Sequence, residues 1–213
     1  MGYFKNNLLC NIIFNKKIGG YDIMIKNIIL DIGGVFFDDS KSNIEKLLNK
    51  NCDNIYKVAY GKGFKKCVLG KSSILEYIDS LKDEDEFEDI SYILRKENLV
   101  KSYPLIESNF LYIKGLKKRG YKLYLLSNIT EDSYFYINDL INIDEVFDGG
   151  VYSYQVNLVK PDINIYNLLI NKFNLNKEET IFFDHKEKNV VMANEVGIKA
   201  FVFNSIEDIE RNI

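Results

Sequence analysis

Four short apolar runs predict the strands of a buried sheet. They are "IKNIILD" (25–31), "YKLYLLSN" (121–128), "TIFFD" (180–184) and "KAFVF" (199–203). Continuous apolar runs of this length are typical of strands that are covered on both faces. Segments with helical spacing of apolar residues lie between them, after Pro104 to Gly120 and over about 131–140, 162–173 and 187–197. Because strands alternate with helices, we expect an α/β fold with a Rossmann-like, doubly wound parallel sheet.

Residues 40–103 have a different pattern, polar and of helical period, with no strong strand. Two amphipathic stripes mark helices there, formed by Ile44, Leu47 and Leu48 and by Ile74, Tyr77, Ile78 and Leu81. Ser42 and Ser72 are candidate N-caps for these helices. The pattern predicts an all-helical insert between two parts of a core domain, 24–39 and 104–213.

Residues 1–23 precede a second methionine, Met24. Asn11 and Asn15 interrupt the only apolar stretch, and no small-residue cleavage site follows, so a signal peptide is not expected. The codons of residues 18–20 can form a ribosome-binding sequence upstream of Met24. We therefore expect this extension to be translated leader, with a genuine N-terminal arm as the alternative; mass spectrometry of the native protein separates the two.

Composition narrows the class of protein. Hydrophobic residues make up 46% and charged residues 28%, values typical of a globular domain. A net charge of −3 without a basic stripe argues against a nucleic-acid partner, and no apolar run is long enough for a membrane span. The three cysteines, Cys10, Cys52 and Cys67, form no CxxC pair and are expected to be buried or idle in a reducing, cytoplasmic compartment. The sequence gives no indication of oligomeric state.

Polar side chains stand where the predicted strands end, at Asp31, Ser127–Asn128, Lys160 and Asp184–His185. In an open parallel sheet, ligands bind beyond the carboxyl ends of the strands. A single acid in such a place is commonly a helix cap or a strand-end residue. The ordered set of carboxylate, hydroxyl, lysine and carboxylate is more specific and predicts a phosphate site.

In this order the segments "IILDIGGVFFD", "LYLLSN", "VKPDINIY" and "IFFDHKEKNVVMANEVGIKAFVF" resemble the four motifs of the haloacid dehalogenase-like (HAD) superfamily. The resemblance covers the chain from Met24 to its end, and it implies a HAD core with a helical C1-type cap over 40–103. The "DxGG" form of the first motif resembles the branch that contains sugar-phosphate phosphatases.

The resemblance implies that Asp31 is the nucleophile and forms an aspartyl-phosphate that water then hydrolyses. Lys160 and Ser127 would hold the phosphate, with Asn128 and the backbone around Gly33 and Gly34 as further phosphate-binding candidates. Asp162, in "VKPD", is expected to cap the following helix.

A Mg²⁺ ion is the implied cofactor. Its ligands would be the side chain of Asp31, the carbonyl of Gly33, and Asp184 or His185 in the fourth motif.

Two positions depart from the family pattern. Phosphatases of this superfamily carry a second acid two residues after the nucleophile, where this chain has Gly33. The direct metal ligand of the fourth motif falls on His185, the only histidine, and imidazole favours Mn²⁺, Fe²⁺ or Zn²⁺ over Mg²⁺. Three outcomes are open: Asp184 takes over the ion directly or through water, His185 recruits a softer metal such as Mn²⁺, or metal binding is lost.

The function expected from this set is a metal-dependent phosphomonoesterase that acts on a small phosphorylated metabolite, such as a sugar phosphate. The helical insert would close over the substrate, with Tyr60, Gly61, Lys62 and Phe64 as candidate contacts. A pseudoenzyme that binds a ligand or protein without turnover is the main alternative. A 2-haloacid dehalogenase is a second one, although no arginine is placed to bind a substrate carboxylate.

Overall fold

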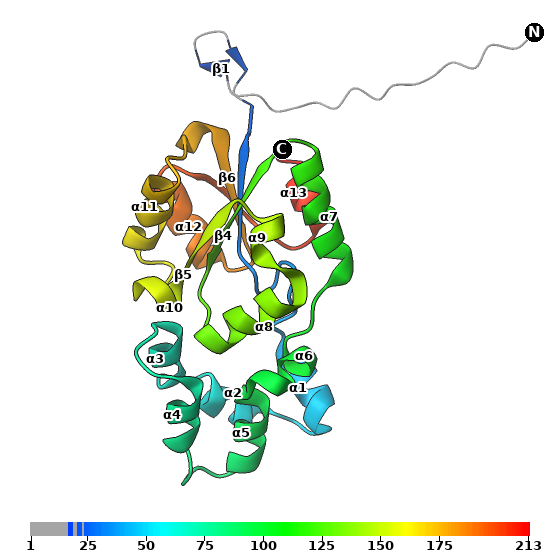
Figure 1. Ribbon diagram of the computed structural model, residues 1–213, viewed down its shortest axis with the longest axis vertical. Helices are drawn as coiled ribbons and strands as arrows, with labels where there is room; N and C mark the ends of the chain where they lie inside the picture. The colour runs from blue at the N-terminus through cyan, green and yellow to red at the C-terminus, as the bar shows by residue number, and fades with distance from the viewer. Residues whose placement is uncertain (1–16, 19–20, 23) are drawn as a thin grey trace, which may run out of the picture.

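The computed structural model describes residues 17–18, 21–22 and 24–213. Its centre is a five-stranded parallel sheet in the order β5–β4–β3–β6–β7 (Figure 1). The strands are β3 (Asn27–Leu30), β4 (Lys122–Ser127), β5 (Gly149–Tyr152), β6 (Thr180–Asp184) and β7 (Lys199–Val202). The expected doubly wound α/β sheet is therefore confirmed.

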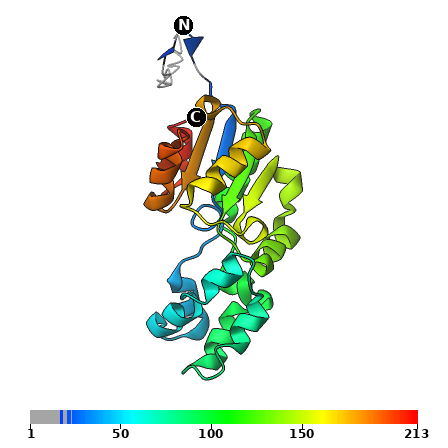
Figure 2. The same ribbon diagram turned by 90° about the vertical axis from the view of Figure 1, so that its left-hand side faces the viewer.

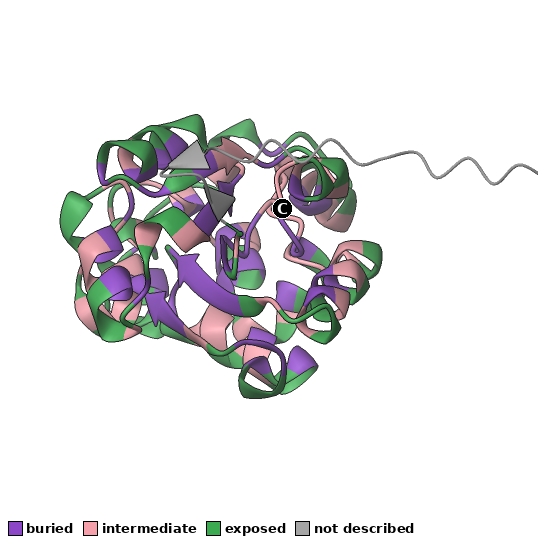
Figure 3. Ribbon diagram, turned by 90° about the horizontal axis from the view of Figure 1, so that it is seen from above, coloured by how far each residue is buried: buried purple, intermediate pink, exposed green. Residues whose placement is uncertain are grey.

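Helices cover both faces of the sheet because each presents one apolar stripe to it. On one face the strands pack against α7 (Glu107–Lys118), α8 (Glu131–Ile141), α9 (Ile143–Val146) and α13 (Ile206–Glu210). On the other face they pack against α11 (Ile163–Lys172) and α12 (Glu187–Glu195). Figure 3 shows the buried strands at the centre and the exposed sides of the helices around them.

Between β3 and α7 the chain forms a helical segment at the end of the molecule beyond the carboxyl ends of the strands (Figures 1 and 2). It consists of α1 (Lys41–Leu48), α2 (Asp53–Ala59), α3 (Phe64–Val68), α4 (Ile74–Asp79), α5 (Phe87–Leu94), η1 (Lys96–Asn98) and α6 (Leu99–Ser102). It has an apolar core of its own that includes Ile55, Ile90 and Ile93.

Two connections join this helical segment to the sheet, and they run side by side. Asp38 donates its backbone N–H to the carbonyl of Pro104 (2.9 Å), and Ile106 donates to the carbonyl of Phe36 (2.9 Å). The two chain connections of the helical segment therefore lie together, near the carboxyl ends of the central strands.

The predicted helix caps are correct in one case and wrong in two. Asp162 caps α11 by accepting the N–H of Asn164 (2.9 Å). The N-cap of α1 is Ser40, so Ser42 lies inside the helix. The N-cap of α4 is Ser73, because its hydroxyl and Glu76 form a capping box, whereas Ser72 donates to the Glu76 carboxylate and caps no backbone N–H.

Near the N-terminus, β1 (Lys17–Ile18) and β2 (Tyr21–Asp22) form a separate antiparallel pair. Most of the predicted translated leader, residues 1–23, lies outside the described residues, as does Cys10. Cys52 and Cys67 are buried free thiols, as expected. Among the described residues, no helix combines the length and apolarity that a membrane crossing requires.

Candidate active site

Asp31 directly follows β3, the central strand, and its side chain is buried among donors. Its Oδ1 accepts hydrogen bonds from the backbone N–H of Ile32 (2.8 Å) and the hydroxyl of Ser127 (3.0 Å). The ammonium of Lys160 lies 2.9 Å from the same oxygen. Oδ2 instead faces His185, whose Nδ1 is 3.5 Å away. The two oxygens of the proposed nucleophile thus face different partners.

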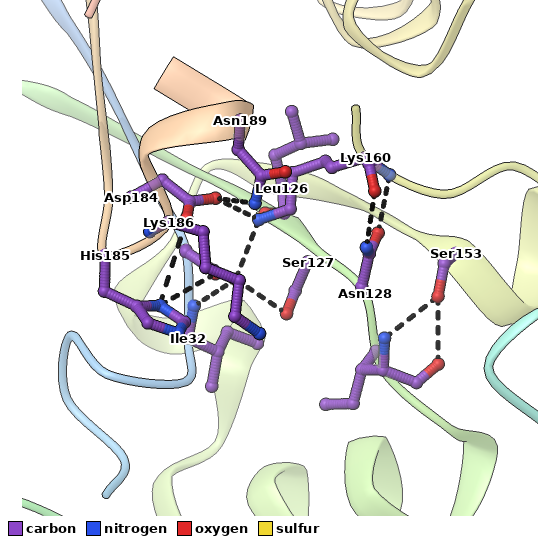
Figure 4. A network of polar contacts seen from close by, with 12 residues as sticks. Ile32, Leu126, Ser127, Asn128, Ser153, Lys160, Asp184, His185, Lys186 and Asn189 are labelled. Carbon is purple, nitrogen blue, oxygen red and sulfur yellow. Dashed lines mark hydrogen bonds and ion pairs between the residues drawn. The ribbon is translucent and has the colours of Figure 1, made fainter. Parts of the chain in front are cut away.

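Lys160 is a buried cation between two carboxylates. Its Nζ lies 2.9 Å from Asp31 Oδ1 and 2.6 Å from Asp184 Oδ2, and it donates to the carbonyl of Leu126 (2.6 Å) (Figure 4). Only 3% of the residue is exposed. A buried ammonium is tolerated because these three acceptors replace its water shell.

Asn128 holds the loop that carries Lys160. Its Oδ1 accepts the backbone N–H of Lys160 (2.7 Å), and its Nδ2 donates to the carbonyl of the same residue (3.0 Å) (Figure 4). Both ends of the amide are occupied in this way, although Asn128 lines the cavity. The geometry therefore favours a positioning role over the predicted phosphate contact.

Asp184 ends β6 and is fully buried. Its Oδ2 accepts from Lys160 and from the amide of Asn189 (2.8 Å), and its Oδ1 accepts the backbone N–H of Lys186 (2.8 Å). Its carboxylate is thus mainly engaged in fixing the lysine and the start of α12.

His185 lies between two acids. Its Nε2 is 3.4 Å from Asp39 Oδ2, and its Nδ1 is 3.5 Å from Asp31 Oδ2 and 3.9 Å from Asp184 Oδ1. Nδ1 is buried and has no hydrogen-bond partner among the described residues. Gly34 makes room for the ring: its φ is +68°, and a Cβ there would lie 2.4 Å from His185 Cγ. Glycine is therefore required at position 34 because a larger residue would collide with His185. This steric role is separate from the predicted binding of phosphate by the backbone at Gly34.

The charged groups in the site shift one another's pKa values. Burial raises the pKa of Asp31, but Lys160 and His185 outweigh it, so the net pKa lies well below the usual value. Burial and repulsion by Asp31 raise the pKa of Asp184. Burial lowers the pKa of His185, yet Asp31 and Asp39 raise it more strongly, to about 9. The site without an added ion therefore holds an excess of negative charge that draws a proton to the imidazole.

This donor set fits a divalent cation. Ligand atoms of Asp31, Asp184 and His185 all lie within 4.8 Å of one another. His185 Nδ1, which has no hydrogen-bond partner among the described residues, lies 3.5 Å from Asp31 Oδ2, and an ion bound by both atoms would satisfy the nitrogen. The mixture of oxygen and imidazole ligands suits Mn²⁺ or Zn²⁺ better than Mg²⁺.

A cavity of about 590 Å³ opens over these residues, between the sheet and the helical segment. On the sheet side it is lined by Asp31, Gly33, Ser127 and Lys160. On the helical side the lining includes Tyr56, Tyr60, Gly61, Phe64 and Lys65. Tyr60, Gly61 and Phe64 were predicted contacts, whereas Lys62 is not among the lining residues and Lys65 stands there instead. The volume is that of a small-molecule site.

The sequence prediction missed three residues of this site. Asp39 and Tyr103 line the cavity near Gly33, and Asn189 holds Asp184. Asp39 and Tyr103 flank the helical segment on its two sides in sequence, so only the pairing of the two connections brings them together. The doubled acid in "FFDDS" was the available signal for Asp39.

An open parallel sheet with a carboxylate after its central strand and a buried lysine beside it is the arrangement of an enzyme whose ligand binds beyond the carboxyl ends of the strands. The family of haloacid dehalogenase-like hydrolases matches residues 25–197. The chain belongs to this family.

Two curated relatives are phosphatases. D-ribitol-5-phosphate phosphatase of Bacteroides thetaiotaomicron is 27% identical over 190 residues, which cover 84% of this chain and 91% of the relative. A sesquiterpene phosphatase of Aspergillus oryzae is 29% identical over 86 residues, 40% of this chain. The matched part spans less than half (44%) of that second relative.

Solved structures share the fold. A magnesium complex of a HAD family enzyme from B. thetaiotaomicron is 20% identical with a TM-score of 0.68, over 84% of this chain and 93% of that one. A predicted HAD-like hydrolase from Porphyromonas gingivalis is 25% identical with a TM-score of 0.65, over 88% and 97%. A dehalogenase is 13% identical with a TM-score of 0.69, over 89% and 97%.

Proposed function

We propose that this protein is a metal-dependent phosphomonoesterase that hydrolyses a small phosphorylated metabolite through an aspartyl-phosphate at Asp31. The observation that carries the proposal is the arrangement around Asp31 Oδ1, where Ser127 and Lys160 lie within 3.0 Å of one carboxylate oxygen. These donors are placed to bind the oxygens of a phosphate that approaches Asp31. The similarity to D-ribitol-5-phosphate phosphatase, which extends over 84% of this chain, supports this reaction class. Membership of the hydrolase family supports it as well.

In the first step, Oδ1 attacks phosphorus and the ester bond to the leaving oxygen breaks. The Ser127 hydroxyl and the Lys160 ammonium turn from the carboxylate to the phosphoryl oxygens. There they stabilise the negative charge that develops in the transition state. In the second step, water attacks phosphorus and the bond to Asp31 breaks. The enzyme returns to its starting state and inorganic phosphate leaves.

The metal ligands in this proposal are Asp31 Oδ2 and His185 Nδ1, with Asp184 at the buried side and the carbonyl of Gly33 as the fourth candidate. A bound divalent ion would supply charge neutralisation between the phosphate and Asp31. Mg²⁺ is the ion of the B. thetaiotaomicron complex. His185 favours Mn²⁺ here.

The helical segment over residues 40–103 acts as the cap in this proposal, attached to a core of 24–39 and 104–213. Its wall of the cavity is largely aromatic, with Tyr60 placed 4.8 Å from Tyr56 and 5.0 Å from Phe64 between ring centroids. Aromatic faces with hydroxyl groups can pack against a sugar ring or another compact carbon skeleton. A sugar or sugar-alcohol phosphate is the first substrate class to test.

The test is hydrolysis of p-nitrophenyl phosphate with Mg²⁺, with Mn²⁺ or with chelator, beside an Asp31→Asn control. We expect turnover that requires the ion and disappears in Asp31→Asn. A panel of sugar phosphates then narrows the substrate. Absence of turnover with every ion would contradict the proposal and favour a binding protein without catalysis.

The dehalogenase alternative has less support in the site. Among the described residues that line the cavity there is no arginine to bind a substrate carboxylate, whereas Lys160 and Ser127 are present. Halide release from a 2-haloacid would favour that alternative over the phosphatase.

A further inference from the structure

Position 33 carries no side chain, yet the space that a side chain there would enter is not empty. A Cβ built on Gly33 would lie 3.0 Å from Asp39 Oδ2 and 3.1 Å from the hydroxyl of Tyr103. A carboxylate from six residues further along the chain therefore occupies the place next to the nucleophile where an acid at position 33 would begin.

The local fold explains why Asp39 returns to this place. After Ile32 the chain makes a tight loop, in which Gly34 donates its N–H to the carbonyl of Phe37 (2.8 Å) and Phe37 forms bridges with Gly33 and Leu105. Phe37 is fully buried and stacks on Tyr103 at 5.2 Å between ring centroids. The loop is thus anchored, and the residues that follow Phe37 pass beside Gly33.

The two adjacent acids of this loop have different environments. The carboxylate of Asp38 accepts the backbone N–H of Ser40 (3.0 Å), which is a structural cap of the turn. The side chain of Asp39 is 37% exposed, lines the cavity and contacts the imidazole of His185. Apart from His185, no cationic side chain among the described residues lies within ion-pair distance of Asp39, and its carboxyl group faces the cavity where a ligand would bind.

We propose that Asp39 is the catalytic acid that protonates the leaving oxygen, in place of the missing acid at position 33. The proposal rests on the phosphatase function proposed above. As Asp31 Oδ1 bonds to phosphorus and the ester bond breaks, the Asp39 carboxyl transfers its proton to the departing oxygen, which leaves as an alcohol. When water attacks the aspartyl-phosphate, Asp39 takes up the proton that the water loses, and the cycle closes without another reactant.

The test uses two substrates that differ in their need for an acid. The p-nitrophenolate group leaves without a proton, whereas the alkoxide of a sugar-alcohol or glycerol phosphate needs one. We expect Asp39→Asn to lower kcat/KM by about 10²–10⁴-fold on glycerol phosphate and by far less on p-nitrophenyl phosphate. Asp39→Glu should restore part of the loss, because a carboxyl group is present again.

Asp38→Asn is the matched control, since it removes the adjacent carboxylate and the same charge. It should affect both substrates alike and only weakly. An equal loss on both substrates in Asp39→Asn, or no loss, would overturn the role of Asp39 while leaving the phosphatase function intact. If wild-type protein hydrolyses neither substrate, the proposed function fails and the role of Asp39 fails with it.

Discussion

At the scale of single residues, Lys160 is the group on which the charge balance of the site depends. It is the buried cation between Asp31 and Asp184. Replacing it with Met would leave two buried carboxylates facing each other, and such an unpaired charge costs about 3–5 kcal/mol. We expect Lys160→Met to lower the free energy of unfolding by about this amount, measured in urea, and to abolish turnover.

Lys199→Met is the control for that experiment, because Lys199 is exposed at the start of β7. Its effect should stay within about 0.5 kcal/mol. A Lys160→Met variant that is as stable as this control would contradict the ion-pair arrangement.

Gly34 provides a second residue-scale prediction. A methyl group there would meet His185 at 2.4 Å, and the φ of +68° is unfavourable for alanine. Gly34→Ala is therefore expected to destabilise the protein by about 1–3 kcal/mol.

Gly115→Ala is the matched control, because Gly115 lies within α7 and a Cβ added there would have nothing within 4 Å. It should raise the free energy of unfolding by up to about 1 kcal/mol. Equal effects of the two variants would disprove the close approach of His185 to Gly34.

At the scale of elements, the contact between α3 and α10 (Ser153–Val156) joins the helical segment to the sheet domain. Ser153 donates to the carbonyl of Val68 (2.6 Å), and Asn157 donates to the carbonyl of Leu69 (2.6 Å). Both contacts can form only when the segment lies against the sheet, as in Figure 1. They hold the helical segment in place over the cavity.

Removing one of these contacts should favour an open arrangement, in which the helical segment lies further from the sheet. Asn157 has a φ of +57°, so Asn157→Gly removes the side chain without backbone strain. One hydrogen bond is worth about 0.5–1.5 kcal/mol, so KM for p-nitrophenyl phosphate should rise about 2–10-fold. Asn49→Gly, with a φ of +52° at the end of α1, is the control and should leave KM unchanged. A KM that is the same in both variants would refute the closing role of the α3–α10 contact.

Elements were more predictable from sequence than the contacts between them. The apolar runs place both ends of β3, β4, β6 and β7 to within two residues, because buried strands need continuous apolar side chains. The short helix α10 was missed, since four residues are too few to show a period. Asp39 was missed for a different reason: its place beside Gly33 depends on the packing of Phe37 against Tyr103, two residues that lie far apart in the sequence.

At the scale of the whole molecule, metal binding and stability should be linked. An ion that binds only the folded state at 100 times its dissociation constant adds about 2.7 kcal/mol. For a chain of 213 residues this corresponds to a rise in Tm of about 5–10 °C. Because His185 offers a nitrogen ligand, Mn²⁺ should raise Tm more than Mg²⁺ at equal concentration, and His185→Asp should narrow the difference between the two ions. Identical Tm values with chelator and with both ions would contradict a metal site.

The central claim is that Asp31 carries the phosphoryl group. The most direct measurement is acid quench of the protein during turnover of p-nitrophenyl phosphate in the presence of Mn²⁺, followed by mass spectrometry of the peptide that contains Asp31. We predict a phosphoryl adduct on Asp31 that appears with substrate and is absent in Asp31→Asn. Turnover with no adduct on Asp31, or with an adduct on another residue, would contradict the account.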